Sequence, residues 1–561
     1  MTTRRCDLLV VGSGAAGLSA AVTAAALGLS VVVIEKDSHV GGTSAWSGGW
    51  LWIPRNELAV EAGIVEDISE PRAYLRAELG EAFDPAMVEM FLEQGPRMIR
   101  FMRRETSVDF IPGNAMPDFH GKTPHAGLGG RSVCGAPFDG RKLGPAIKRL
   151  RRPLDLISPF GMAIASGADL QAFLDASSKP KAAWHVAKRF LRHFRDLLLH
   201  GRGMHLVNGN ALIARLFKSA NDLGVEILTS APAQEILIEN GRVVGMKAGG
   251  EDIRAERGVV LAAGGFPHDL ARKAAMFPHA PTGAEHHSAA PETNTGDGLR
   301  LGESAGGYVR QDLSNAGAWA PVSLVPKPDG SVGRFPHLVE RAKPGAIMVL
   351  PNGKRFTNEA NSYHDVMQAL FATGFTEAWL ICDHQFQIRY GLGRARPFPY
   401  LIDPWLKNGY LKRGQTLVDL ASQCGINAAN LLATFTTYNR NAVRGEDPEF
   451  GRGDTAYNRI QGEARHKPNP NVAPIRRGPF YAVKIVPGSL GTFSGLRTDE
   501  HARVLRPDGA AVEGLWAVGN DMSSMMGGRY PAGGITLGPG MTFGYVAAHD
   551  AAGVPLDNNR T

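Results

Sequence analysis

A glycine-rich turn near the N-terminus has the spacing of a nucleotide-phosphate binding site. Residues 12–17 read Gly-Ser-Gly-Ala-Ala-Gly, a G-x-G-x-x-G pattern. In such a turn Gly12 permits the tight bend, Gly14 lets the backbone approach a pyrophosphate, and Gly17 lets the next helix pack closely on its strand. The N-terminus of that helix offers free N–H groups and a positive dipole end to the phosphates. Glu35 follows where an acid would accept hydrogen bonds from a ribose.

The segments around this turn supply the elements that would position it. Residues 8–11 form a short apolar run, as in a strand buried on both faces, and residues 31–34 form a second one. Between them, residues 15–27 are small and apolar, which favours a helix. Strand, helix, second strand and terminal acid together predict a complete βαβ unit of a fold that binds NAD or FAD.

Later segments favour FAD and predict that its domain is split between the two ends of the chain. Residues 42–49 form a loop of small and hydroxyl residues, on which a bulky ring can lie. A buried strand at 258–266 ends in Ala-Gly-Gly, and the tail has a strand at 515–518 before Gly519 and a helix from near Gly538, whose N-terminus would face the electron-rich edge of a reduced flavin. The predicted cofactor-binding residues are Gly12, Ser13, Gly14, Ala15, Ala16, Gly17, Glu35, Lys36, Gly42, Thr43, Ser44, Ser47, Gly48, Gly49, Ala233, Ala263, Gly264, Gly519, Asn520, Ile535 and Leu537.

The predicted fold class is α/β, with a split Rossmann-like FAD-binding domain and an inserted α+β catalytic (capping) domain. We assign residues 1–285 and 486–561 to the FAD-binding domain and 286–485 to the insert. Residues 64–106 are expected to be mostly helical, with Pro85 and Pro96 dividing the stretch into separate helices. Residues 233–246 predict a hairpin that turns at Asn240-Gly241.

Composition excludes several classes of protein. The 561 residues carry a net charge of +7, but no nucleic-acid-binding signature accompanies the charge, so we expect no nucleic-acid partner. The four cysteines are scattered without a C-x-x-C pair, which predicts neither a metal site nor a disulfide framework and makes a cytoplasmic location the default. No uninterrupted apolar run reaches about 18 residues, so no membrane-spanning helix is expected.

A basic helical segment, about residues 146–205, is expected within the first part of the FAD-binding domain. Between 179 and 200 basic residues interleave with Trp184 and Phe190. Such a helix could lie on an anionic membrane surface. Because its charges surround the aromatic residues, we favour a solvated helix packed on the domain, with membrane association at most peripheral.

Several motifs from residue 7 to about 550 resemble the flavoproteins of the fumarate reductase and succinate dehydrogenase type, and more closely the 3-ketosteroid dehydrogenases. They are VVGSGAAGLSAAVTAAALG, GGTSAWSGGWLWIP, LAAGGF, NTGDG, GKRFTNEANSYHD, GLWAVGN and GGRYPAGGITLGPGMTFGYVAA. The resemblance implies non-covalently bound FAD and α,β-desaturation of a cyclic ketone. The steroid branch is indicated mostly by the stretch 530–534 and by Tyr363.

The resemblance also implies roles for three residues. In 1-ene-forming members a tyrosine and a glycine N–H of a Tyr-Pro-x-x-Gly stretch hold the 3-keto oxygen, and Tyr530 and Gly534 match these positions. A second tyrosine, after an Arg-Phe-x-Asn-Glu stretch, removes the proton beside the carbonyl, and Tyr363 matches it. The flavin takes the hydride from the next carbon. An ordinary tyrosine pKa of about 10 makes a weak base, so Tyr363 needs a positive or hydrogen-bonding neighbour, which the sequence does not identify.

The chain departs from the family pattern at two positions. Members commonly have a further tyrosine in the loop before Gly-Arg-Ser, but here Phe119 and His120 precede Gly130-Arg131-Ser132. Either His120 or water replaces the missing hydroxyl, or the substrate differs from the usual steroid. The 4-ene-forming relatives have a serine two residues after the tail tyrosine; Ala532 stands there, which favours 1-ene chemistry.

Four functions remain open from the sequence. The first is 3-ketosteroid 1-dehydrogenation with an unidentified electron acceptor, and the second is dehydrogenation of a smaller cyclic ketone such as a cyclohexanone. The third is a fumarate-reductase-like reaction on an enoate, for which Arg529 and Arg341 would clamp a carboxylate. The fourth, a flavin-binding protein without enzymatic activity, is disfavoured by the two tyrosines at family positions.

Overall fold

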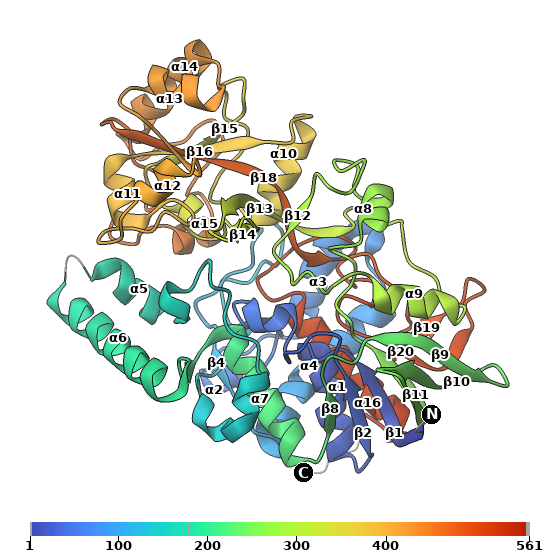
Figure 1. Ribbon diagram of the computed structural model, residues 1–561. Helices are drawn as coiled ribbons and strands as arrows, with labels where there is room; N and C mark the ends of the chain where they lie inside the picture. Colours follow the sequence, from blue (N-terminus) through green and yellow to red (C-terminus); the bar gives the residue numbers. More distant parts are fainter. Residues whose placement is uncertain (1–2, 166, 177–178, 557–561) are drawn as a thin grey trace.

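The FAD-binding part is built on an eight-stranded sheet to which both ends of the chain contribute (Figure 1). The computed structural model describes residues 3–165, 167–176 and 179–556. In this sheet β1 (Thr3–Val11) runs parallel to β2 (Val31–Ile34) and β11 (Glu251–Leu261). β20 (Ala511–Ala517), from the far end of the chain, pairs in parallel with β11. The predicted α/β class and the split cofactor domain are confirmed.

Two helices of small residues pack closely against each other beside this sheet. α1 (Ala15–Ala26) follows the glycine turn, and α16 (Leu537–Ala552) is the last helix of the described chain. The Ser19 hydroxyl donates to the Met541 carbonyl at 2.8 Å, so the two helices are also joined by a hydrogen bond. A Cβ at Gly544 would lie 2.5 Å from the Ala16 carbonyl oxygen, so this approach requires glycine.

The remaining elements of this part include one confirmed and one wrong prediction. β9 (Ala233–Glu239) and β10 (Arg242–Ala248) form the predicted hairpin, with Asn240 and Gly241 at φ 49° and 80°. α4 (Pro85–Glu105) is one continuous helix with Pro96 inside it, so the expected break there is wrong. The other elements are α2 (Glu57–Glu61), α3 (Ser69–Leu79), α7 (Asn208–Asp222), α8 (Leu270–Met276), α9 (Asp297–Ser304), β3 (Trp50–Trp52), β4 (Phe110–Pro112), β5 (Ser132–Gly135), β6 (Phe138–Asp139), β7 (His205–Leu206), β8 (Glu226–Leu228) and β19 (Arg503–Leu505).

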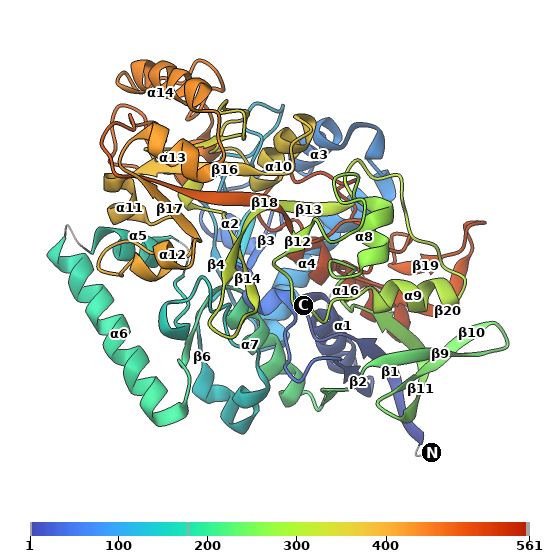
Figure 2. The ribbon, with the colours of Figure 1, turned by 45° about the horizontal axis from the view of Figure 1, so that its top comes forward.

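A second, seven-stranded sheet forms the upper part of the molecule (Figure 2). Its central strand is β18 (Phe480–Thr492), which pairs antiparallel with β13 (Gly317–Pro326) and β16 (Ala378–Asp383). Around it lie β12 (His287–Ser288), β14 (Val332–Pro336), β15 (Ala346–Val349), β17 (Leu411–Gly414), α10 (Tyr363–Ala372), α11 (His384–Tyr390), α12 (Asp403–Lys407), α13 (Leu417–Cys424), α14 (Ala428–Ala442) and α15 (Ala456–Gln461).

The basic segment forms two helices, α5 (Ala168–Asp175) and α6 (Pro180–His200), at the left edge of the molecule in Figure 1. They lie beneath the upper part of the fold, near α11 and α12, in both ribbon views (Figures 1 and 2). Among the described residues no helix is long and apolar enough to cross a membrane.

Candidate active site

One cavity of about 1810 Å³ is lined by residues of both sheets and of the α5–α6 segment. Nearly all of the residues predicted to bind the cofactor line it, together with Tyr363, Tyr530, Gly534 and Phe119. Two predicted cofactor residues are absent from its lining: Gly17, whose added Cβ would lie 2.1 Å from the Gly12 carbonyl oxygen, and the buried Ile535. Gly17 therefore serves close packing of helix on turn, as its place in the motif predicts.

The glycine turn leaves space on its cavity side and has the geometry that a pyrophosphate needs. Gly12 has φ +109°, and a Cβ there would lie 2.2 Å from the Ala262 carbonyl oxygen. A Cβ at Gly14, in contrast, would meet only the Ser44 hydroxyl at 3.6 Å. Gly14 precedes α1 and supplies no side-chain cap; the Ala15 N–H donates to the Ser44 hydroxyl at 3.1 Å, and the positive end of α1 faces the cavity, where it favours a phosphate. This cradle fits the diphosphate of FAD.

Glu35 is held in place at the end of β2. One carboxylate oxygen accepts from the Ser13 N–H at 3.0 Å and from the Ser13 hydroxyl at 2.6 Å, and the other accepts from the Asp37 N–H at 2.9 Å. Each oxygen has further acceptor capacity, since a carboxylate offers about four lone-pair sites. The carboxylate is thus oriented beside the phosphate turn, where a ribose could donate to it.

Segments far away in the sequence complete the cofactor walls. The Lys36 ammonium donates to Thr295 at 2.6 Å and to Asp297 at 2.8 Å, and the Asn294 amide donates to the Thr43 hydroxyl at 3.1 Å. The Asp521 carboxylate accepts from the N–H groups of Ala263 and Gly265 at 2.5 and 2.8 Å, which fixes the Ala-Gly-Gly turn. The sequence does not identify these contacts, although the NTGDG stretch, 294–298, is one of the motifs that carry the family resemblance.

Four aromatic side chains meet in the part of the cavity next to the cofactor walls. The Phe119 ring is stacked on the Tyr530 ring at 5.7 Å between centroids and meets the Tyr363 ring edge-on at 5.8 Å. Tyr363 and Tyr530 also pack edge-on at 5.0 Å. Tyr457, which the sequence did not single out, lies nearest to Phe119, at 4.3 Å. Phe119 therefore connects three tyrosines from three separate segments.

Tyr363 is the first residue of α10, and hydrogen bonds on both sides of it fix its position. The Ser362 hydroxyl caps the helix by accepting from the Asp365 N–H at 3.1 Å. The Arg341 guanidinium donates to the carbonyl groups of Glu359 and Asn361. The loop that leads into Tyr363 is thereby tied to the buried Arg341 side chain.

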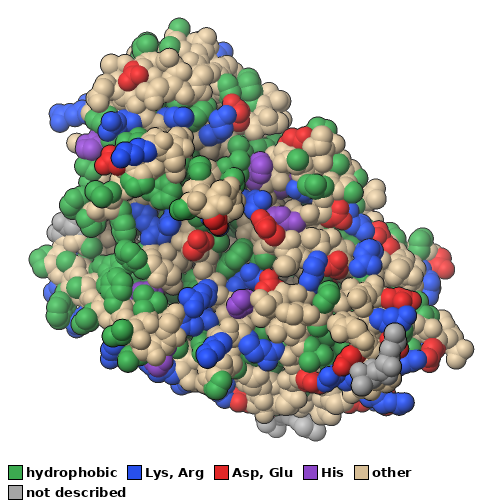
Figure 3. Space-filling model, viewed as in Figure 1, with side chains coloured by type: hydrophobic (Ala, Val, Ile, Leu, Met, Phe, Trp, Pro, Cys, Tyr) green, Lys and Arg blue, Asp and Glu red, His purple; other side chains and the backbone are tan. Residues whose placement is uncertain are grey.

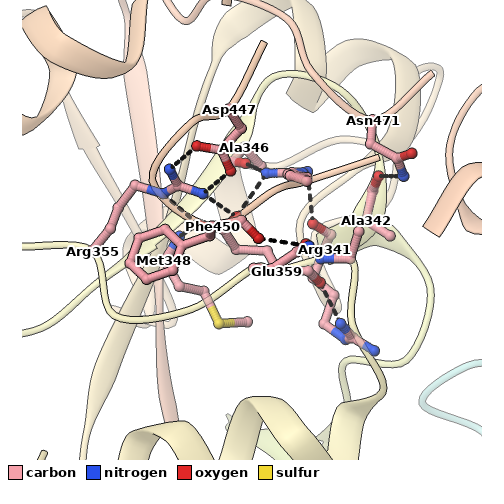
Figure 4. Close-up of polar contacts among 12 residues, drawn as sticks. Arg341, Ala342, Ala346, Met348, Arg355, Glu359, Asp447, Phe450 and Asn471 are labelled. Carbon is pink, nitrogen blue, oxygen red and sulfur yellow. Dashed lines mark hydrogen bonds and ion pairs between the residues drawn. The ribbon is translucent and has the colours of Figure 1, made fainter. Parts of the chain in front are cut away.

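A buried ion network holds the same loop from its other side (Figure 4). Arg355 forms a two-point pair with Glu359 at 3.0 and 2.8 Å and a second one with Asp447 at 2.8 and 3.0 Å. Arg452 donates to Glu359 at 3.0 Å and to the carbonyl of Ala346 at 2.6 Å. The Arg and Glu of the Arg-Phe-x-Asn-Glu stretch therefore build the support of Tyr363 and do not line the cavity.

The electrostatic surroundings of Tyr363 include one cation. Burial raises the pKa of Tyr363 well above its ordinary value, the neighbouring Tyr530 and Tyr457 raise it further, and Arg341 acts in the opposite direction. Arg341 is completely buried, forms no ion pair with a described carboxylate, and has one terminal nitrogen without a hydrogen-bond partner in the described chain. The pKa of Tyr457 is raised to about 12, mainly by burial, with Arg341 acting in the opposite direction.

His120 does not occupy the position of a base. Its two ring nitrogens contact carboxylates, Glu78 at 2.6 Å and Asp365 at 2.9 Å, and it is not part of the cavity lining. Burial disfavours its charged form, but the bonds to Asp365 and Glu78 outweigh burial and raise the pKa of His120 to about 10. A protonated, doubly paired imidazole cannot accept a proton, so the suggestion that His120 replaces the missing hydroxyl is not supported by this geometry.

Comparisons with known proteins agree with this arrangement. The model of the FAD binding domain family matches residues 7–537. A 4-oxocyclohex-2-ene-1-carboxylate 5-dehydrogenase from Sinomonas cyclohexanicum is 39% identical, over 98% of this chain and 94% of the relative. A 3-oxosteroid 1-dehydrogenase from Mycolicibacterium smegmatis is 37% identical over 98% of both chains. The solved 3-ketosteroid delta1-dehydrogenase from Sterolibacterium denitrificans, in complex with 1,4-androstadiene-3,17-dione, superposes with a TM-score of 0.91 at 34% identity and covers 98% of this chain and 100% of its own.

The chain belongs to the FAD binding domain family. It shares this family with 3-oxosteroid 1-dehydrogenases and with a 4-oxocyclohexene-carboxylate dehydrogenase, all similar to it over nearly their full length, and it is an FAD-dependent dehydrogenase of CH–CH groups. The glycine cradle and the oriented Glu35 are consistent with this cofactor. No group of metal-binding side chains occurs among the described residues.

The positions of Arg529 and Arg341 bear on the third function, the fumarate-reductase-like reaction on an enoate. Arg529 is exposed and does not line the cavity. Arg341 directs two of its nitrogens at backbone carbonyls of residues 337, 359 and 361 and is likewise outside the lining. The two arginines proposed as a carboxylate clamp therefore do not come together at the cavity, and this function loses its basis.

Proposed function

We propose that the protein is a 3-ketosteroid 1-dehydrogenase. The observation that carries this proposal is the single cavity that joins the cofactor walls to Tyr363, Tyr530 and Gly534 and continues between apolar side chains. Pockets for one small ligand usually measure roughly 300–1,000 Å³. A cavity of about 1810 Å³ accommodates FAD and a polycyclic substrate together.

In this proposal the ketone oxygen is held by two donors. The Tyr530 hydroxyl and the Gly534 N–H donate to it, and both bonds strengthen as negative charge develops on the oxygen. Tyr363 removes a proton from the carbon beside the carbonyl, and the electrons of that C–H bond form the enolate. FAD bound between the glycine turn and the tail segments would supply the acceptor for the hydride of the next carbon. As the hydride leaves, the enolate electrons return and the new C=C bond forms.

We also propose that Tyr457 supplies the hydroxyl that is missing at Phe119. Tyr457 is buried, lines the cavity and packs directly on the Phe119 ring. Arg341, whose charge no described carboxylate pairs, influences the pKa of Tyr457 and of Tyr363 alike. A cation in this position stabilises the phenolate form and so makes a buried tyrosine a usable base. The tyrosine that assists Tyr363 would thus come from α15 and not from the loop before Gly-Arg-Ser.

A smaller cyclic oxo acid is the second candidate substrate, and one observation favours it. Arg396 lines the cavity, and one of its buried terminal nitrogens has no hydrogen-bond partner among the described residues. A carboxylate would satisfy it, and the Sinomonas relative acts on a cyclohexene carboxylate by name. The apolar extension of the cavity, however, would remain unfilled by so small a substrate.

A panel of ketones distinguishes the two substrates. The purified holoenzyme is mixed anaerobically with a saturated-ring 3-ketosteroid, with 4-oxocyclohexanecarboxylate and with cyclohexanone, and the flavin absorbance is followed. We expect the steroid to bleach the flavin fastest and the product to carry a 1-ene, identified by NMR. Faster bleaching by the oxo acid, lost in an Arg396→Gln variant, would establish the second candidate.

A further inference from the structure

The longest helix of the basic segment, α6, turns some of its polar residues inward and leaves several large apolar residues exposed. His193 and Asp196 are buried, and Asp196 accepts from Arg141 at 2.7 Å and from the Met204 N–H at 3.1 Å. Arg189 donates to the Ala163 carbonyl at 2.9 Å. Some of the charges that were expected to surround the helix are therefore turned inward, and the outward side carries both apolar and basic residues.

The outer face of α6 carries an apolar stripe at helical spacing. Trp184, Leu191, Phe194 and Leu198 recur every three to seven residues and are 63%, 74%, 47% and 86% exposed. Leu199 continues the stripe, and Phe160, Phe398 and Leu401 of two nearby loops are also exposed. We call these eight residues the apolar face. Figure 3 shows hydrophobic side chains gathered over this part of the molecule, with Lys and Arg beside them.

The exposed charges on α6 itself have one sign, whereas the neighbouring loops also carry the exposed acids Asp155 and Asp403. Lys181, Lys188, Arg192 and Arg195 are exposed on α6, and the Lys188 ammonium lies 5.0 Å from the centre of the Trp184 ring. The acids of α5 and α6, Asp169, Asp175 and Asp196, have only 12%, 6% and 1% of their side chains exposed. A second copy docked on this face would bring like charges together, whereas an anionic surface would be attracted.

The cavity reaches the same face. Phe160 and Phe194 belong both to the exposed apolar face and to the lining of the cavity, and Phe190, which is stacked on Phe194 at 5.9 Å, lines it too. Phe160 also contacts Tyr400 of the upper part at 6.3 Å between centroids, and Tyr400 lines the cavity as well. The apolar face therefore borders an entrance to the cavity at Phe160, Phe194 and Phe398.

We propose that the apolar face docks on the surface of an anionic lipid bilayer, with α6 lying in the interface. An amphipathic helix with Trp and Leu on one side and Lys and Arg at its borders binds in this way, because the apolar side chains enter the acyl boundary while the basic groups reach the headgroups. The cavity entrance then opens towards the lipid. This inference goes beyond the proposed function and does not depend on which ketone is the substrate.

Vesicle sedimentation of the holoenzyme tests this inference. Vesicles of phosphatidylcholine alone and of phosphatidylcholine with a third of phosphatidylglycerol are compared for the wild type, Leu191→Glu/Leu198→Glu and Lys188→Glu/Arg195→Glu. The matched control is Leu270→Glu/Leu432→Glu, which changes two leucines that are exposed elsewhere, by 55% and 43%. Flavin content and melting temperature show that each variant is folded.

The wild type and the control are expected to pellet with the anionic vesicles. The leucine variant is expected to lose at least about tenfold in partition coefficient, since burial of one leucine side chain alone contributes about that factor. The charge variant should lose the preference for anionic lipid. Wild type that stays in solution with both vesicles, or a folded leucine or charge variant that pellets like wild type, overturns the proposal. If the wild type is a dimer that the leucine variant converts to a monomer, the apolar face binds a second copy of the chain and not a bilayer.

Discussion

Tyr363 faces the main chemical difficulty of the proposed reaction. Burial raises its pKa, so the phenolate form that accepts the substrate proton depends on Arg341 as the favourable charge. We expect Tyr363→Phe to lower the rate of flavin reduction by about 10² or more, with little change in ketone binding, since a general base acts mainly in the transition state. Stopped-flow absorbance and ketone titration measure the two effects; an unchanged reduction rate would remove Tyr363 from the mechanism.

The role of Tyr457 can be tested by removing its hydroxyl and placing a hydroxyl on the neighbouring Phe119 ring instead. Tyr457→Phe is expected to slow flavin reduction by about tenfold to a hundredfold. Adding Phe119→Tyr should restore much of the rate, because the two rings are 4.3 Å apart and the hydroxyl returns to the position usual in the family. Tyr410→Phe, a buried tyrosine outside the cavity, is the control. If the double variant is as slow as Tyr457→Phe, the exchange of roles is wrong.

At the scale of single residues, the sequence predicts the roles of those that lie within one contiguous motif. Gly12, Gly14 and Glu35 are close together in the chain and share one βαβ unit, so local structure is enough to bring them together. Tyr457 and Arg341 are separated from Tyr363 by many residues, and only the packing of α15 and its neighbours brings them to the same cluster. From the sequence, Phe119 can therefore be recognised as a departure from the family pattern, but the compensating Tyr457 cannot.

His120 joins two helices, since it contacts Glu78 of α3 and Asp365 of α10. Its pKa is raised from 6.5 to about 10 in the folded protein, so the stability it contributes is complete below about pH 6.5 and disappears as the pH rises through about 10. We expect wild type to melt at a higher temperature than His120→Gln near pH 6, with the difference shrinking towards pH 10. A difference that stays constant over this range would contradict the paired imidazolium.

The buried ion network behind α10 leads to a second prediction, which concerns how much this network stabilises the fold. Glu359→Gln removes the charge that Arg355 and Arg452 share in the interior and leaves them underpaired. Loss of one partner of a buried pair costs about 3–5 kcal/mol, so the free energy of unfolding should fall by about that amount. Glu377→Gln, which breaks the exposed pair with Lys484, should cost less than about 1 kcal/mol. Denaturant unfolding compares them; equal losses would show that the network is not a special support.

The elements themselves were predictable where one periodicity dominates. The parallel strands and the Asn240-Gly241 hairpin follow from apolar runs and turn residues. Pro96 was expected to end a helix, but α4 continues through it because its apolar face, including Phe91, Met98 and Ile99, is fully buried and outweighs the lost hydrogen bond. The orientation of α6 was not predictable, because a sequence shows amphipathicity but not which face is turned inward.

At the scale of the whole molecule, segments from both ends of the chain line the part of the cavity that we propose holds the cofactor. We expect one FAD for each folded chain, bound without a covalent link, so that acid precipitation releases all of the yellow colour. Unfolding should release it as well, because the walls at Gly12–Gly17 and at Gly519–Leu537 separate when the shared sheet opens. Colour that remains in the acid pellet would contradict non-covalent binding.

The two parts of the fold meet where the ketone is proposed to bind, and Tyr530 is the residue through which this claim is most directly tested. Tyr530→Phe keeps the ring and removes the hydroxyl. Loss of one donor to a developing oxyanion costs about 10²–10³ in rate. The decisive measurement is anaerobic stopped-flow reduction of the flavin by a 3-ketosteroid in wild type and Tyr530→Phe with equal FAD content. We expect fast bleaching of the wild-type flavin and a reduction slower by about that factor in the variant; a variant that is reduced as fast as wild type, or a wild-type flavin that no cyclic ketone reduces, would contradict the proposed function.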